Sequence, residues 1–144
     1  MRAVIQRVTQ AHVKVDGKMV GQIERGYLVY LGIHVDDTKE QAIKLAQKIH
    51  QLRINEDEEG KMNRSLTSVG GSILVISQFT LYGDTKGNNR PSFIQAARPE
   101  KAEPLYQLIC NELKKNHPLE MGQFGEHMQV YSINDGPVTI LIEM

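Results

Sequence analysis

The sequence predicts an α+β protein, with a mainly antiparallel, barrel-like β core and two amphipathic helices packed on one side of it. Several segments alternate between apolar and polar residues, which is the period of a β-strand, and most of them follow one another in hairpin order. Only two segments show the 3.6-residue period of a helix. Neither a repeat nor a linker interrupts the 144 residues, so we expect one domain over residues 1–144.

The first third of the chain predicts strands. Residues 2–8 and 11–15 alternate, Asp16-Gly17 is a tight-turn signal, and residues 19–23 resume the alternation, which predicts a hairpin. Residues 27–33 form a near-continuous apolar run, which is typical of a strand that is covered on both faces.

The period then changes to that of a helix over residues 38–52. Either Asp37 or Thr38 is placed to cap its start, and Glu40 or Gln41 is placed to complete a capping box. The expected apolar stripe consists of Ala42, Leu45, Ala46 and Ile49.

After this helix we expect a short strand at Leu52–Ile54 and an acidic, solvated turn over residues 55–61, which lacks the ligand and glycine spacing of a calcium loop. Residues 72–81 give the strongest strand signal, apolar up to Ser77 and polar beyond it within a still-extended pattern. A loop over residues 83–91 and a helix over residues 99–116 follow. The tail predicts strand, turn and strand over residues 128–133, 134–137 and 138–142.

Composition excludes several classes of function. Equal numbers of basic and acidic residues, 17 each, give no support to a protein that coats duplex nucleic acid. The single Cys110 excludes an internal disulfide and fits a reducing compartment, so we expect a cytoplasmic protein. No apolar run approaches the ~20 residues of a membrane helix, and the first residues do not resemble a signal peptide. The five histidines lack metal-ligand spacing, so we expect no metal.

The segment Ser77-Gln78-Phe79-Thr80 is the first candidate site, because an apolar strand ends there in two hydroxyls and an amide. One interpretation is a strand that leaves the core, with its hydroxyls bonded to neighbouring backbone. The other is a site for an ester, in which Thr80 or Ser77 supplies a hydroxyl and backbone N–H groups form an oxyanion hole.

Gly136-Pro137 is the second candidate, although an ordinary turn is the simplest interpretation. Since proline lacks an N–H group, this dipeptide presents two carbonyls and could read shape but could not activate a nucleophile.

Other residues have equally open interpretations. Arg7 fits a surface cation at a sheet edge; Lys86, Arg90 and Arg98 fit a phosphate-facing patch or a solubilised loop; Phe93, Phe124 and Met128 fit the core or a platform for a base.

Taken together, the motifs resemble those of the D-aminoacyl-tRNA deacylase family over essentially the full length. The resemblance is carried by residues 2–8, Leu52–Ile54, Asp57–Asn63, Ser77–Leu81, Arg90–Phe93, Phe124–Met128 and Asn134–Thr139. It implies a homodimeric, cofactor-free hydrolase that cleaves the carboxylic ester between a D-amino acid and the 3′-terminal adenosine of tRNA. Glycyl-tRNA would also be a substrate, and L-aminoacyl-tRNA would be rejected in this chiral proofreading.

The resemblance also implies a role for each candidate residue. The Gly136-Pro137 bond would be cis, and this dipeptide would enter the pocket of the other subunit and reject L-amino acids, with Arg7 holding its orientation. The segment Ser77-Gln78-Phe79-Thr80 would line the reacting ester, and Phe124 and Met128 would lie near the adenine. Two alternatives remain beside the deacylase: a non-catalytic module that binds tRNA ends, and a Ser/Thr-nucleophile esterase for small D-amino-acid esters.

Overall fold

The computed structural model describes residues 1–144, and it is α+β as expected. The strands are β1 (Arg2–Val15), β2 (Lys18–Ile23), β3 (Gly26–Gly32), β4 (Asn55–Glu56), β5 (Met62–Arg64), β6 (Ser72–Ser77), β7 (Leu119–Met121) and β8 (Gln129–Glu143). The helices are α1 (Lys39–Gln51) and α2 (Pro99–Lys114), with two 3-10 turns, η1 (Thr67–Val69) and η2 (Phe79–Tyr82). Neither helix combines the length and the apolar character needed to cross a membrane.

One long strand organises the main sheet. β1 pairs antiparallel with β3 through its first half, with β2 through its second half, and with β8 along its other edge. The sheet then continues from β3 to β6 and β7 by parallel pairing. It is therefore mixed, with mainly antiparallel neighbours, because the connections through α1 and α2 are long enough to return the chain to the same end.

The sheet curls until its two end strands, β2 and β7, approach each other. A Cβ atom on Gly21 of β2 would lie 2.9 Å from the carbonyl oxygen of Met121 in β7. The curl encloses a small apolar cluster between β1, β2, β3 and β6, which includes Val13, Leu28 and Leu74. The barrel-like sheet of the sequence prediction is thus confirmed.

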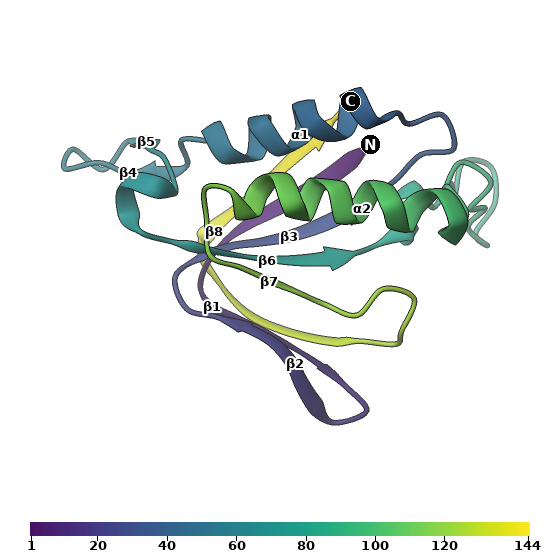
Figure 1. The fold of residues 1–144 in the computed structure, drawn as a ribbon, viewed down its shortest axis with the longest axis horizontal. Helices are drawn as coiled ribbons and strands as arrows, with labels where there is room; N and C mark the ends of the chain where they lie inside the picture. The colour runs from purple at the N-terminus through teal and green to yellow at the C-terminus, as the bar shows by residue number, and fades with distance from the viewer.

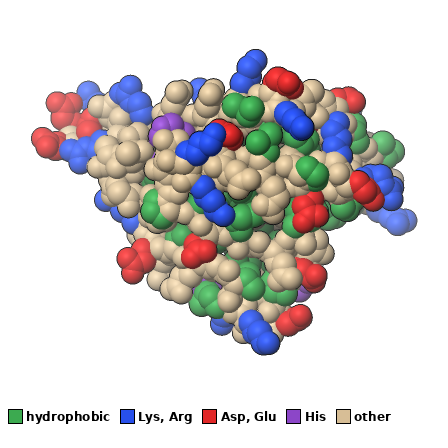
Figure 2. Space-filling view, in the orientation of Figure 1, with side chains coloured by type: hydrophobic (Ala, Val, Ile, Leu, Met, Phe, Trp, Pro, Cys, Tyr) green, Lys and Arg blue, Asp and Glu red, His purple; other side chains and the backbone are tan.

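Both helices cover the other face of the sheet, where most of the core lies (Figure 1). Thr38 caps α1, and its hydroxyl and the Gln41 side chain form a complete capping box. The buried residues of α1 are the four predicted ones, Ala42, Leu45, Ala46 and Ile49. On the outer face of the helices, Lys/Arg and Asp/Glu side chains are interspersed, as Figure 2 shows.

Three boundaries differ from the sequence prediction. The two short strands expected at 2–8 and 11–15 are one strand, β1, because β8 pairs with both halves. Leu52–Ile54 is not a strand, and the short pairing begins only at Asn55. The strand expected over residues 72–81 ends at Ser77, where the chain turns into η2. A hydrogen bond from Arg2 of β1 holds this turn, and the local pattern does not encode it.

The expected turn at residues 134–137 is also different. Gln6 of β1 pairs with Thr139 and Val8 pairs with Asn134, so the four residues between them bulge out of β8 opposite Arg7. The chain does not reverse there, because both flanking segments pair with the same strand in the same direction.

Candidate functional site

A pocket of about 580 Å³ opens where the carboxyl end of β6, the start of α2 and the β7–β8 connection meet. In Figure 1 these segments lie toward the end of the molecule opposite the β4–β5 hairpin. The lining of the pocket is mostly apolar, and it contains seven of the candidate residues: Ser77, Gln78, Phe79, Phe93, Arg98, Phe124 and Met128. An apolar pocket with a few polar groups is typical of a site for a small molecule or for the end of a larger one.

The Ser77–Thr80 segment is held by the neighbouring strands. The Gln78 N–H group donates to the carbonyl of Leu31 over 2.8 Å, which extends the β3–β6 pairing by one residue. Arg2 donates from Nη1 to the carbonyl of Leu81 over 2.8 Å, and its guanidinium lies 4.7 Å from the Tyr82 ring centroid. These contacts fix η2 at the edge of the pocket.

The first two N–H groups of η2, those of Phe79 and Thr80, donate to no acceptor in the protein. This is expected of the first residues of a helical turn, which have no intrahelical partner. Two adjacent free N–H groups at a pocket edge suit the stabilisation of an oxyanion. The interpretation of this segment as a strand with satisfied hydroxyls is not supported, because Thr80 lies in a helical turn.

The Thr80 hydroxyl has one side-chain partner, the Gln78 amide, and no histidine or carboxylate bonds to it. Thr80 is exposed, and unlike Ser77, Gln78 and Phe79 it is not among the residues that line the pocket. A hydroxyl without a base is a weak nucleophile. This geometry therefore favours a positioning role for Thr80, through Gln78.

Aromatic side chains form the walls of the pocket. Phe79 and Phe93 meet edge to face with their ring centroids 5.1 Å apart. Phe124 packs 5.7 Å from the ring of Tyr106, whose hydroxyl donates to the carbonyl of Val75 over 3.0 Å. Burial raises the pKa of Tyr106 far above its usual range, so the phenol remains neutral and holds its hydrogen bond.

Met128 lies in the β7–β8 connection and packs on the backbone of Gly122. A Cβ atom on Gly122 would lie 2.7 Å from the Met128 sulfur, so only glycine leaves room for this contact. Together with Phe124, Met128 supplies a flat and adaptable apolar surface, suited to a nucleobase.

The second candidate segment is the bulge of β8. Its Gly136-Pro137 peptide bond is cis, as the family resemblance implies, and both residues are exposed. Asn134 closes the bulge: its Oδ1 accepts from the Val138 N–H group over 3.1 Å, and its Nδ2 donates to Thr139 Oγ1 over 3.0 Å. These two bonds explain the polar residues that flank Gly136-Pro137 in the sequence.

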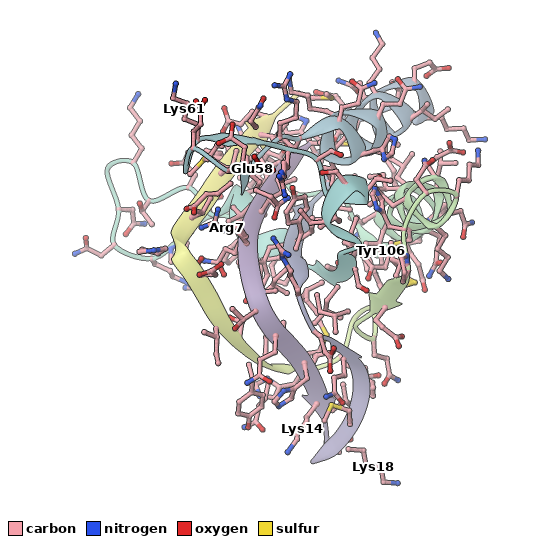
Figure 3. All side chains as sticks on the ribbon, turned by 90° about the vertical axis from the view of Figure 1, so that its left-hand side faces the viewer. Arg7, Lys14, Lys18, Glu58, Lys61 and Tyr106 are labelled. Atoms are coloured by element: carbon pink, nitrogen blue, oxygen red, sulfur yellow. The ribbon has the colours of Figure 1, made fainter.

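Arg7 of the adjacent strand β1 holds the same bulge, and Figure 3 shows this side chain beside the bend of β8. It is buried, not a surface cation, and it donates to the carbonyls of Ile54 over 2.9 Å and Asp135 over 3.2 Å. Its guanidinium also lies within 3.5 Å of the carboxylates of Glu56 and Asp135. Arg7 therefore ties the bulge to the β4–β5 hairpin.

The pocket and the bulge do not meet within one chain. Neither Gly136 nor Pro137 lines the pocket, and the bulge is bound instead to the β4–β5 region at the other end of the molecule (Figure 1). The structure thus brings the candidate residues together in two groups, Ser77–Phe79 with Phe124 and Met128, and Arg7 with Gly136-Pro137.

Two features were missed by the sequence analysis. His50 and His117 form a pair, with His50 Nδ1 2.9 Å from His117 Nε2, although 67 residues separate them. No spacing signal could reveal this contact, because it depends on how the carboxyl ends of α1 and α2 pack. No group of three or more His, Cys, Asp or Glu side chains is placed to hold a metal ion. The second feature is the separation of Arg98 from Lys86 and Arg90: the sequence analysis grouped all three as a candidate phosphate-facing patch, but only Arg98 lines the pocket, together with Glu126 and His127.

Comparison with known proteins gives a consistent result. Residues 4–143 match the family model described as D-Tyr-tRNA(Tyr) deacylase. Proteins named D-aminoacyl-tRNA deacylase from Symbiobacterium thermophilum and Halalkalibacterium halodurans are each 53% identical, over 99% of this chain and 95% or 99% of theirs.

Solved structures agree with this match. A structure titled "c-Myc DNA Unwinding Element Binding Protein" superposes with a TM-score of 0.94 at 41% identity, covering 100% of this chain and 99% of the other. A probable eukaryotic D-amino acid tRNA deacylase superposes with a TM-score of 0.84 at 20% identity, over 99% of this chain and 98% of that one, which shows the shared fold.

Proposed function

Since the chain belongs to the D-Tyr-tRNA(Tyr) deacylase family, we propose that it hydrolyses the ester bond of D-aminoacyl-tRNA and of glycyl-tRNA, and rejects L-aminoacyl-tRNA. The match of residues 4–143, almost the whole chain, is the observation that carries this proposal. The products are free tRNA and the free amino acid, so the protein is a hydrolase that proofreads chirality in translation. It acts without a cofactor, in the cytoplasm.

The pocket provides what ester hydrolysis requires. Water adds to the ester carbonyl carbon, the bond to the ribose oxygen breaks, and that oxygen takes up a proton. The N–H groups of Phe79 and Thr80, free of protein acceptors, stabilise the negative charge that develops on the carbonyl oxygen. An aminoacyl ester is already reactive, so fixing it beside these donors supplies much of the catalysis.

The other lining residues place the terminal adenosine. Phe124 and Met128 hold the adenine, with Phe124 braced by Tyr106. Ser77 and Gln78 lie between this surface and η2, so they line the reacting ester. Gln78 also holds the Thr80 hydroxyl, which positions the substrate.

The active form is a homodimer in which the Gly136-Pro137 bulge of one subunit enters the pocket of the other. The bulge is exposed and rigidly held, yet it lies away from the pocket of its own chain. β8 pairs only with β1, so its other edge is free, and it exposes Tyr131, Ile133 and Leu141. An open edge strand with exposed apolar side chains suits an interface between two copies.

The two carbonyls of Gly136-Pro137 account for the chiral selection. An L-amino acid in the pocket would direct its Cβ atom into these carbonyls, whereas a D-amino acid directs it away and glycine has none. Selection by a steric clash tolerates many D side chains, because no side chain has to be gripped.

Hydrolysis of four matched esters tests the proposal: D-Tyr-tRNA, L-Tyr-tRNA, Gly-tRNA and D-Tyr ethyl ester. We expect rapid cleavage of the first and third, and little cleavage of the second and fourth. Binding of D-Tyr-tRNA without turnover would indicate a tRNA-end binding module instead. Equal turnover of D-Tyr-tRNA and the ethyl ester would indicate a small-ester esterase.

A further inference from the structure

Arg98 is the only Lys or Arg among the 18 residues that line the pocket. Its backbone is fixed, because its carbonyl accepts from the N–H groups of Lys101 and Ala102 over 3.0 and 2.9 Å at the start of α2. The preceding residue is fixed as well, since the Ala97 N–H group donates to the carbonyl of Ile33 over 2.9 Å. The side chain of Arg98 therefore extends from a rigid point at the pocket.

The guanidinium of Arg98 has no partner within the protein. Four other arginines donate side-chain hydrogen bonds or form ion pairs, namely Arg2, Arg7, Arg53 and Arg64. Arg98 is exposed and forms neither, although the carboxylate of Glu126 lines the same pocket. A guanidinium presents five donors in a planar fork that matches a phosphate group, and here the whole fork is available.

The proposed substrate carries one group that suits this fork. The terminal adenosine of tRNA is joined to the rest of the molecule by a phosphodiester on its 5′ oxygen. Among the lining residues, which also include the polar Ser77, Gln78 and His127, Arg98 alone carries a permanent positive charge to pair with it. Glu126 would repel it, so the phosphate is favoured on the Arg98 side of the pocket.

We propose that Arg98 binds the 5′-phosphate of the terminal adenosine and so makes the enzyme prefer an ester attached to a nucleotide over an ester without a phosphate. This inference rests on the proposed deacylase function and adds a specificity-determining residue to it. The contact acts on binding, so it is expected in KM more than in kcat.

Two minimal substrates test it: adenosine with D-tyrosine on its 3′ oxygen, and 5′-AMP with D-tyrosine at the same position. For the natural enzyme we expect kcat/KM about tenfold higher for the phosphorylated ester, the lower end of what a charge-assisted hydrogen bond provides, since the site is open to solvent. In Arg98→Gln this preference should disappear, and Arg98→Lys should restore part of it. Arg25→Gln, at an exposed arginine that does not line the pocket, is the matched control and should keep the preference.

A second measurement does not depend on turnover of the small esters. AMP should inhibit D-Tyr-tRNA hydrolysis more strongly than adenosine does, and Arg98→Gln should make the two inhibitors equal. The difference should shrink at high salt. A preference for phosphate that survives in Arg98→Gln, or its absence in the natural enzyme, would overturn the role of Arg98. Failure of the natural enzyme to cleave any D-ester, D-Tyr-tRNA included, would instead overturn the proposed function.

Discussion

Replacing Arg7 tests how the Gly136-Pro137 bulge is held. Arg7→Ala removes the donors to two backbone carbonyls, those of Ile54 and Asp135, and the bond to Ile54 is fully buried. The bulge then loses its link to the β4–β5 hairpin. We expect the variant to be less stable and to discriminate less between D- and L-substrates, because a loosened bulge no longer places its carbonyls precisely.

The size of the effect follows from these contacts. A hydrogen bond from a charged donor contributes about 1.5–3 kcal/mol, and its loss leaves a buried acceptor unpaired. The carboxylates of Glu56 and Asp135 are 57% and 53% exposed, so their ion pairs with Arg7 add little. We therefore expect Arg7→Ala to lower the free energy of unfolding by about 3 kcal/mol. For a chain of this length that corresponds to a decrease in Tm of roughly 6–12 °C.

The assay combines thermal unfolding with hydrolysis of D- and L-Tyr-tRNA, both at one fixed protein concentration because the Tm of the proposed dimer would depend on it. Arg7→Lys is the matched control: it keeps the charge but cannot bridge both carbonyls, so its effect should be intermediate. A loss below about 1 kcal/mol in Arg7→Ala, together with full discrimination, would refute the reasoning.

Four further predictions concern single sites. Thr80→Ala should lower the rate about 10²–10³-fold without admitting L-substrates, as for a lost positioning contact; measurable cleavage of L-Tyr-tRNA would contradict this. Gly136→Ala places a Cβ atom 2.7 Å from Val138 Cγ2 at a φ of +132°, so its rate of D-Tyr-tRNA hydrolysis should fall more than about tenfold. The control Gly87→Ala, at a φ of +77° with open space around the new Cβ atom, should retain activity. Equal rates of hydrolysis by these two variants would contradict the clash at Gly136. Burial, and then the neighbouring His50, lowers the pKa of His117, so the folded state favours its neutral form. The free energy of unfolding should therefore fall as the pH drops below about 6.5. In urea unfolding, this fall should be smaller for His117→Gln than for the control His127→Gln. EDTA should leave hydrolysis intact, since no three ligand side chains converge; loss of activity that a divalent ion restores would refute this.

The local pattern of the sequence predicted most elements, because each has one clear period. The stripe of α1 and the doubly covered β3 follow from hydrophobic spacing, and the turn between β1 and β2 follows from the residue types of Asp16-Gly17. Asp16 and Gly17 both have positive φ values, 49° and 77°, as this type of tight hairpin turn requires.

The errors occurred where distant contacts decide the conformation. Phe79–Tyr82 has a strand-like composition but forms a 3-10 turn, which Arg2 fixes from β1. Gly136-Pro137 has the composition of a hairpin turn but lies in a bulge, since β1 pairs on both sides of it. No local signal reveals that Arg7 is buried, because its acceptors come from β4–β5 and β8. Only the family resemblance assigned Arg7 to the bulge.

The most direct test of the shared site is complementation between two defective chains. Thr80→Ala impairs the pocket and Gly136→Ala impairs the bulge, so each variant alone should be nearly inactive on D-Tyr-tRNA. When the two are mixed, dissociated and allowed to reassociate, half of the dimers are mixed, and one of the two sites in each has a natural pocket facing a natural bulge. We expect recovery of about one quarter of the natural activity, with L-Tyr-tRNA still rejected. A mixture no more active than the average of the two variants would contradict the claim that each site is built from two chains.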